Sequence, residues 1–282
     1  MREGRVAASL RHPSLVAVYE AGAVGDLCYI ASEYCPGPNL TSFLKRQEGR
    51  LPPRMAARIA VDLAEGTAYV HRNGIVHRDL KPANVLLDPL DEGDGRPDGL
   101  TYRARITDFG IAKMRSEEPD LTLTGSIIGT PQFMSPEQAS GRRTEIGPSS
   151  DIYSLGAILY VMLSGRAPVV GENDLETLRK VEIEEPAPLR RRFPAVPIDL
   201  EAICLKCLEK RPEGRYASAD ELAEDLRRFL DHLPVRARPQ TRVVRMVRQL
   251  RRQRFSLRPL LAVAILSAAV LGVLGWNYGT MR

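Results

Sequence analysis

The chain has 282 residues, a charged fraction of 27% and no low-complexity tract or internal repeat, which excludes disordered and repeat proteins and leaves one sizeable domain with an appendage. The formal net charge is +5, but nine arginines between Arg236 and Arg258 form an acid-free run. Removing these nine and Arg282 from the 40 lysines and arginines leaves 30 basic against 35 acidic residues, a net charge of −5. We therefore expect no nucleic-acid binding by the globular part.

Helical periodicity supplies most of the expected elements. The apolar residues Met55, Ile59 and Leu63 predict a helix over 52–73, which Asn73-Gly74 would end with a left-handed cap. A loop rich in glycine and proline is expected over 88–103. A helix that is hydrophobic on nearly all sides is expected over 149–164, and outer helices over 172–180, 199–208 and 219–230. The fold class is therefore α+β, with helices dominant.

A run of polar residues follows the first long helix. It reads His77-Arg78-Asp79-Leu80-Lys81-Pro82-Ala83-Asn84, and Asp108-Phe109-Gly110 and Ser135-Pro136-Glu137 come later. Transfer of a γ-phosphoryl group requires metal ligands, a cation and a carboxylate that orients the acceptor. Asp79 can take the proton of an acceptor hydroxyl, and Lys81 can reach the moving phosphate. Asn84 and Asp108 offer the oxygen ligands that Mg²⁺ prefers.

This ordered set resembles the catalytic loop, the metal-binding triplet and the end of the activation segment of bacterial kinases of the eukaryotic type. Ser135 stands where that family has alanine, a mild departure. The resemblance runs from about residue 3 to residue 230. It implies a protein-kinase-like fold with a mainly helical large lobe, ATP and Mg²⁺ as cofactors, and protein substrates. It also implies that Asp151 ties down the catalytic-loop backbone and that Arg215 pairs with Glu137.

The segment 29–35 looks like the hinge that holds adenine in this family. Glu33 and Cys35 would offer backbone groups to the base, and Leu86 would pack beneath it. Glu3 has the position of the helix C glutamate, which lies near the nucleotide phosphates. The domains implied by the resemblance are a small-lobe remnant at 1–35 and a large lobe at 36–232.

Two cues within the resemblance indicate serine and threonine as acceptors. Lys81 and Thr130 are similar to the residues that crowd and polarise a small hydroxyl acceptor in serine/threonine kinases. Arg78 beside Asp79 is typical of kinases whose activation segment is ordered by a phosphate. The candidate sites of autophosphorylation are Thr122, Thr124 and Ser126, although each is also compatible with a plain polar loop.

Two parts of a complete kinase do not precede Glu3 in the sequence: a glycine-rich loop and the strand lysine that pairs with the helix C glutamate. We expect a truncated small lobe with two strands, around 15–19 and 29–33, weakly held because a two-stranded hairpin is marginal in water. Three explanations stay open: a longer protein, a decayed kinase, or a pseudokinase that acts as a membrane-tethered binding module. The intact catalytic residues favour an active kinase that is part of a longer protein.

A charge-free run of 20 residues, 259–278, predicts a transmembrane helix, because about 20 residues at ~1.5 Å each span the hydrocarbon core of a bilayer. The alternative is a buried core helix. Trp276 and Tyr278 lie at its far end, as aromatic residues do at membrane interfaces, and the preceding arginines indicate that the kinase domain is cytoplasmic. The segment 233–258 would be a basic juxtamembrane segment, either amphipathic on anionic lipid or a solvated linker.

The sequence thus predicts a single-pass protein of the cell membrane that transfers phosphate from Mg·ATP to serine or threonine of proteins. Its expected partners are protein substrates, ATP and the lipid bilayer. A homodimer is compatible with the sequence, which gives no signal for or against one.

Overall fold

The computed structural model describes residues 10–24, 27–47, 49–90, 101–108 and 130–237. The chain divides into two units, and the first, Met1–Arg238, contains all of these residues. Among the described residues, no helix is long and apolar enough to cross a membrane. The expectations for Glu3, Thr122, Thr124, Ser126 and the span 259–278 fall outside them.

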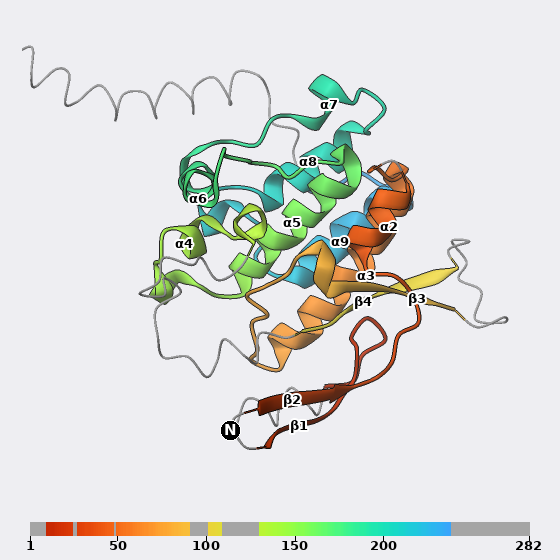
Figure 1. Cartoon of the computed structure of the whole chain (residues 1–282). Coiled ribbons are helices and arrows are strands. Elements are labelled where there is room, and N and C mark those ends of the chain that lie inside the picture. Colours follow the sequence, from red (N-terminus) through yellow and green to blue (C-terminus); the bar gives the residue numbers. More distant parts are fainter. Residues whose placement is uncertain (1–9, 25–26, 48, 91–100, 109–129, 238–282) are drawn as a thin grey trace, which may run out of the picture. The chain divides into compact units, whose positions relative to one another are not determined.

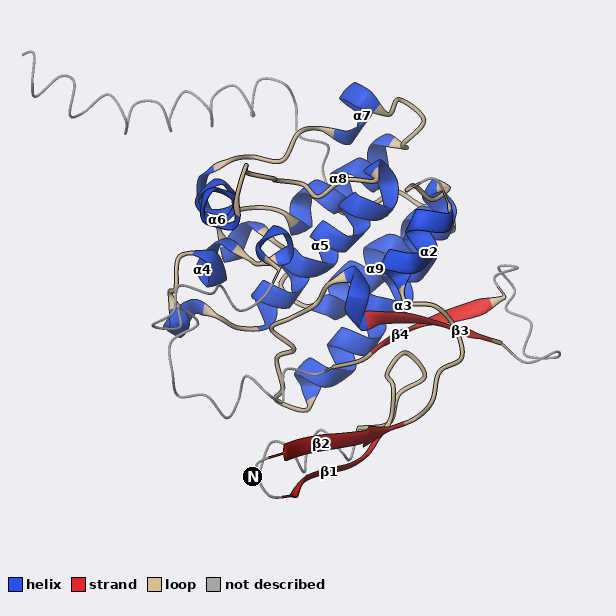
Figure 2. Cartoon of the chain, in the orientation of Figure 1, coloured by secondary structure: helices blue, strands red, loops and turns tan. Residues whose placement is uncertain are grey.

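In the described part of the chain, packed helices form the core of the first unit (Figures 1 and 2). They are α3 (Pro53–Arg72), α5 (Pro148–Ser164), α8 (Ile198–Cys207) and α9 (Ala219–Leu230). Helix α3 packs against α5 and α9, and α5 packs against α8 as well. Helix α5 is buried along almost its whole length, as its continuous hydrophobic sequence predicts, with Tyr153, Ile158 and Met162 fully inaccessible to solvent.

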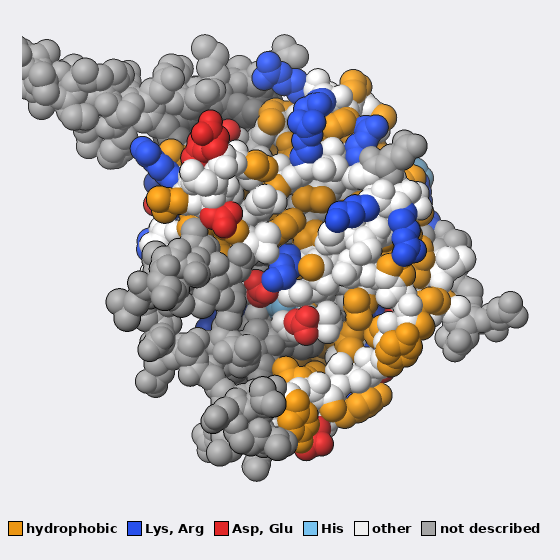
Figure 3. Space-filling view, in the orientation of Figure 1, with side chains coloured by type: hydrophobic (Ala, Val, Ile, Leu, Met, Phe, Trp, Pro, Cys, Tyr) orange, Lys and Arg blue, Asp and Glu red, His pale blue; other side chains and the backbone are white. Residues whose placement is uncertain are grey.

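Shorter helices surround this core. They are α2 (Leu40–Arg46), α4 (Pro136–Ala139), α6 (Asp174–Ile183) and α7 (Leu189–Arg192), with 3-10 turns at Pro82–Asn84, Pro131–Phe133, Arg143–Glu145 and Pro212–Gly214. Side chains cap several N-termini: Asn39 accepts from the Ser42 amide at α2, and Asn173 accepts from the Glu176 amide at α6. Figure 3 shows lysine and arginine side chains gathered over α2 and α7.

Two antiparallel pairs of strands complete the described fold. The first is a hairpin of β1 (Val18–Val24) and β2 (Leu27–Ser32), and the second pairs β3 (Val85–Pro89) with β4 (Tyr102–Ile106). The hairpin exposes large apolar side chains (Figure 3), with Tyr19 62% and Ile30 47% exposed. The chain before β1 is joined to β4, because Val16 donates its amide to the carbonyl of Ile106 at 2.9 Å.

The five predicted helices are confirmed, with ends displaced by at most three residues. The first predicted strand, 15–19, is wrong in its position. Residues 15 and 16 bond to β4 instead of entering the hairpin, so β1 begins only at Val18. The loop predicted over 88–103 is also too long, because its two ends extend β3 and β4.

The first unit continues beyond the large-lobe boundary expected at residue 232. Val235 packs against the core, and Ala237 is 1% exposed. The buried carboxylate of Asp225 accepts hydrogen bonds from the Tyr216 hydroxyl and from the backbone amides of Arg236 and Ala237. These bonds hold the segment after α9 on the folded unit.

Candidate functional site

The centre of the site is the loop between α3 and β3, where Asp79, Lys81 and Asn84 converge. The Lys81 ammonium lies 2.8 Å from Oδ2 of Asp79, and both side chains are about four-fifths buried. Asn84 donates its amide to the backbone carbonyl of Asp79 at 2.9 Å and to Oδ2 at 3.3 Å. Because the nitrogen of the Asn84 amide is engaged, its oxygen is the atom that remains to bind a cation.

Asp151, on the first turn of α5, holds the loop backbone. Its two carboxylate oxygens accept the amides of His77 at 2.8 Å and Arg78 at 2.9 Å. Arg78 has a left-handed φ of 65°, which is unfavourable for a side chain of this size. The two charge-assisted bonds therefore stabilise a strained turn directly before Asp79, and the predicted role of Asp151 is confirmed.

His77 connects this loop to the residue before Asp108. Its Nδ1 accepts from the Asp79 amide at 3.3 Å, and its Nε2 lies 3.0 Å from the carbonyl of Thr107. The tautomer with its proton on Nε2 can make both of these hydrogen bonds. Thr107 also donates its amide to the carbonyl of Asn84 at 3.0 Å, so the two predicted metal ligands, Asn84 and Asp108, belong to one bonded unit. Asp108 itself is exposed and has a φ of 56°.

The predicted adenine hinge follows β2. Glu33 donates its amide to the carbonyl of Ala17 at 2.8 Å, and Cys35 is half-buried. Leu86, on β3, is half-buried and forms a bridge with Asn39, directly before α2. The side chain of Glu33 binds Arg105 of β4, an arginine that no motif in the sequence singles out. The guanidinium of Arg105 keeps the pKa of Glu33 below its usual value.

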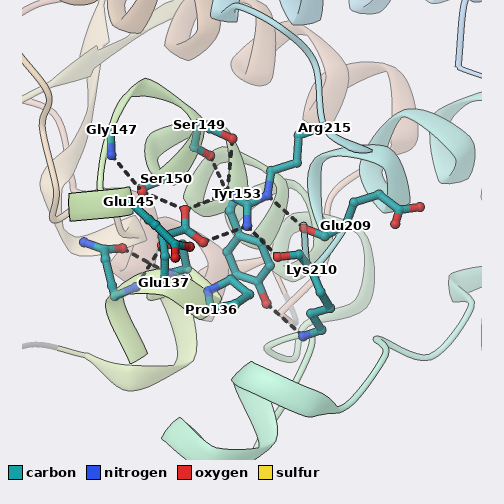
Figure 4. A network of polar contacts seen from close by, with 12 residues as sticks. Pro136, Glu137, Glu145, Gly147, Ser149, Ser150, Tyr153, Glu209, Lys210 and Arg215 are labelled. Atoms are coloured by element: carbon teal, nitrogen blue, oxygen red, sulfur yellow. Dashed lines mark hydrogen bonds and ion pairs between the residues drawn. The ribbon is translucent and has the colours of Figure 1, made fainter. Parts of the chain in front are cut away.

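A buried ion pair anchors the segment 130–139, which includes α4 (Figure 4). Glu137 of α4 makes two parallel bonds with Arg215, at 2.8 and 2.9 Å, and both side chains are almost fully buried. Ser150 donates its hydroxyl to the same carboxylate at 2.7 Å, and the guanidinium lies 5.1 Å from the centre of the Tyr153 ring. The predicted pairing of Arg215 with Glu137 is confirmed.

The same segment contacts the loop between α3 and β3. Gln138 of α4 donates its amide to the carbonyl of Arg78 at 2.8 Å, a contact that the sequence did not predict. Thr130 is half-buried and lies directly before the 3-10 turn Pro131–Phe133. The ion pair therefore positions a segment that reaches the residue next to Asp79.

Comparison with known proteins accounts for this arrangement. The profile of the family described as the protein kinase domain (Pkinase) matches residues 1–226. The chain belongs to the protein kinase family. This kinase chain is 38% identical over 240 residues to the serine/threonine-protein kinase PknB of Mycobacterium leprae, covering 84% of the chain and 36% of that relative. It is 36% identical over 231 residues to the serine/threonine-protein kinase PrkC of Bacillus subtilis, covering 82% of the chain and 33% of that relative.

Solved structures share the kinase fold. A structure of Rad53 residues 1–466 in complex with AMP-PNP has a TM-score of 0.62 and 24% identity, and the match covers 79% of this chain and 52% of that one. The PknI kinase domain of Mycobacterium tuberculosis has a TM-score of 0.59 and 24% identity. That match covers 80% of this chain and 75% of the PknI chain. The kinase chain spans about a third of the length of the curated relatives named above.

Proposed function

We propose that this protein kinase transfers the γ-phosphate of ATP to serine and threonine residues of proteins. The observation that carries the proposal is the cluster of Asp79, Lys81 and Asn84 on a loop that Asp151 holds in a strained conformation. Asp79 would accept the proton of the substrate hydroxyl as the hydroxyl attacks. Lys81, at 2.8 Å from that carboxylate, would neutralise charge on the transferred phosphate.

The donor atoms present fit Mg·ATP. The amide oxygen of Asn84 and the carboxylate of Asp108 are hard oxygen ligands, and the bond between Thr107 and Asn84 links their positions. Magnesium bound there would neutralise phosphate charge and orient the nucleotide. Backbone groups of Glu33 and Cys35 would bind adenine, and Leu86 would pack beneath it. Glu3 would take the position of the helix C glutamate, near the nucleotide phosphates. Thr130 would help to position the acceptor hydroxyl.

Two finer features belong to the same proposal. Autophosphorylation would occur on Thr122, Thr124 or Ser126, and Arg78, exposed beside Asp79, would bind the resulting phosphate. The span 259–278 would anchor the chain in the cell membrane, with the kinase domain in the cytoplasm and the basic segment 233–258 at the lipid surface. Release of the chain from membranes by an alkaline carbonate wash would contradict the anchor.

The deciding experiment is phosphate transfer by the full chain in detergent. Radiolabelled Mg·ATP and a peptide library with serine, threonine or tyrosine acceptors should give label on serine and threonine only. Asp79→Asn should lower the rate by about 10²-fold or more, because general-base catalysis is lost while the loop keeps its shape.

Glu65→Gln is the matched control, because Glu65 pairs with Arg227 on the surface, and it should leave the rate unchanged. An Asp79→Asn variant as active as the wild type would refute the proposal. Inactivity of the wild-type chain and also of a longer chain that supplies a glycine-rich loop and the strand lysine would refute it as well and favour a binding module.

A further inference from the structure

Arg105 makes hydrogen bonds to several segments around the proposed adenine site. It lies on β4, three residues before Asp108, and its side chain is 11% exposed. Its Nη1 donates to Oδ2 of Asp88 at 2.6 Å and to Oε1 of Glu33 at 3.0 Å, and its Nη2 donates to the second oxygen of Glu33. The guanidinium thus binds one carboxylate through both of its oxygens and a second through one.

The same guanidinium also binds the chain that precedes the hairpin. Nε and Nη2 donate to the carbonyl of Leu15 at 3.2 and 2.8 Å. Nη1 lies 3.6 Å from the sulfur of Cys35. One side chain therefore joins three segments that are far apart in the sequence: the residues before β1, the hinge after β2, and β3.

The position of Arg105 in the sheet places it beside the proposed nucleotide. Arg105 on β4 is directly opposite Leu86 on β3, and directly opposed residues of an antiparallel pair project from the same face. Leu86 is the residue proposed to lie beneath adenine, and Glu33 and Cys35 are those proposed to bind its edge. Arg105 contacts both hinge residues and adjoins the floor of the site.

The electrostatics make this connection specific to arginine. One guanidinium faces the two carboxylates of Glu33 and Asp88, and Arg11 adds a further positive charge that acts on Glu33. The planar fork of arginine can serve several acceptors in fixed directions, whereas the ammonium of lysine acts as a compact point charge on a flexible stem. Lysine at this position would keep the charge and lose part of the geometry.

We propose that Arg105 is a positioning residue for ATP: its guanidinium holds the hinge at a fixed distance from the floor of the adenine site. This inference rests on the proposed kinase function. The bonds that join Asp79, Lys81 and Asn84 do not involve Arg105, so its loss should leave this cluster in place. Its loss should therefore raise the KM for ATP and leave kcat nearly unchanged.

The first test needs no activity. Hydrogen exchange of residues 33–37 is measured in the full, unliganded chain, for the wild type, Arg105→Lys and Arg105→Met. Preorganisation by Arg105 predicts exchange about tenfold faster in Arg105→Met, an intermediate value in Arg105→Lys, and no change in α9. Unchanged hinge exchange, or equally faster exchange throughout the unit, would overturn the inference even if the chain is inactive.

The second test measures phosphate transfer by the same variants. Arg105→Met should raise the KM for ATP about tenfold, with kcat changed by less than about twofold, and Arg105→Lys should lie between it and the wild type. The control is Arg227→Met, which removes an exposed ion pair with Glu65 and should affect neither constant. A mobile hinge with an unchanged KM would overturn the inference, whereas an inactive wild type would concern the proposed function alone.

Discussion

At the scale of single residues, the buried pair of Glu137 and Arg215 shows how charge is accommodated in this interior. Both side chains are at most 1% exposed, so each loses almost all of its hydration. The cost is offset because every oxygen of the carboxylate has a donor and the guanidinium also binds the backbone carbonyls of Ser149, Glu209 and Lys210 (Figure 4). Substitution of one partner by a neutral residue leaves the other buried without an opposite charge.

Glu137→Gln should therefore destabilise the protein strongly. The expected loss at pH 7 is about 3–5 kcal/mol in the free energy of unfolding, because Arg215 stays buried without its counterion. Urea denaturation followed by circular dichroism measures it. Glu65→Gln, which removes the exposed partner of Arg227, should cost less than about 1 kcal/mol, and equal losses in the two variants would contradict this account.

The stability difference between the wild type and Glu137→Gln should also depend on pH, in a direction that the pKa of Glu137 determines. Burial raises the pKa of Glu137, but the bonds from Arg215 and Ser150 outweigh it and keep that pKa below the ordinary 4.5. A lowered pKa in the folded state contributes stability above the ordinary value, and this contribution is lost as pH falls through the folded pKa. The gap between the wild type and Glu137→Gln should therefore narrow below about pH 4.5.

At the scale of elements, the sequence predicted what depends on local periodicity. The long helices followed from apolar spacing, and the family motifs correctly predicted the contacts of Asp151 with the loop backbone and of Arg215 with Glu137. Short elements such as α4 and α7 were not predicted, because four residues carry no periodicity. The strand predicted at 15–19 was misplaced because Leu15 pairs with Ile106 of β4, a residue far away in the sequence that local periodicity does not reveal.

Arg105 marks the limit of sequence reasoning for the site. An arginine between two apolar residues of a strand looks like an ordinary half-exposed position, and its partners lie 17, 72 and 90 residues away. Only the three-dimensional fold brings Asp88, Glu33 and Leu15 to one guanidinium. No motif of the sequence includes Arg105, so its long-range partners could not be predicted in the way that the pairing of Arg215 with Glu137 was.

The ends of α3 and α5 allow a matched test of helix termination. Both have glycine in the left-handed region, Gly74 with a φ of 75° and Gly165 with a φ of 73°. A Cβ at Gly74 would meet no atom within 4 Å, whereas one at Gly165 would lie 2.9 Å from the carbonyl oxygen of Gly49. The two glycines therefore have nearly the same backbone conformation but differ in how much space a Cβ atom would find.

Gly74→Ala should cost about 1–2 kcal/mol, the price of left-handed backbone for a residue with a Cβ. Gly165→Ala should cost about 1–3 kcal/mol more, because the new methyl group also crowds the carbonyl of Gly49. Urea midpoints of the two variants give the difference directly. Equal losses in the free energy of unfolding would contradict this account and mean that the loop at Gly49 moves away from the new methyl group without destabilising the protein.

At the scale of the whole molecule, the first unit is closed by the segment that follows α9. Asp225 is fully buried, and two of its three donors are the backbone amides of Arg236 and Ala237. Arg228 also donates to the carbonyl of Pro234 at 2.7 Å. These residues belong to the folded kinase domain by packing, although their composition resembles that of the basic segment that follows.

A chain ending at Arg238 should therefore unfold cooperatively with the full stability of the first unit. A chain ending at Leu233 should lose about 3 kcal/mol or more in the free energy of unfolding, because it lacks both amide donors to Asp225. Each hydrogen bond to a buried carboxylate contributes about 1.5–3 kcal/mol. Urea denaturation of both chains measures this loss. Asp225→Asn in each chain completes a double-mutant cycle. The substitution should be costly in the longer chain and much less costly in the shorter one, because there the two amide donors are already absent. Equal effects of Asp225→Asn in the two chains would mean that the closing segment acts through the apolar contacts of Val235 and Ala237 alone.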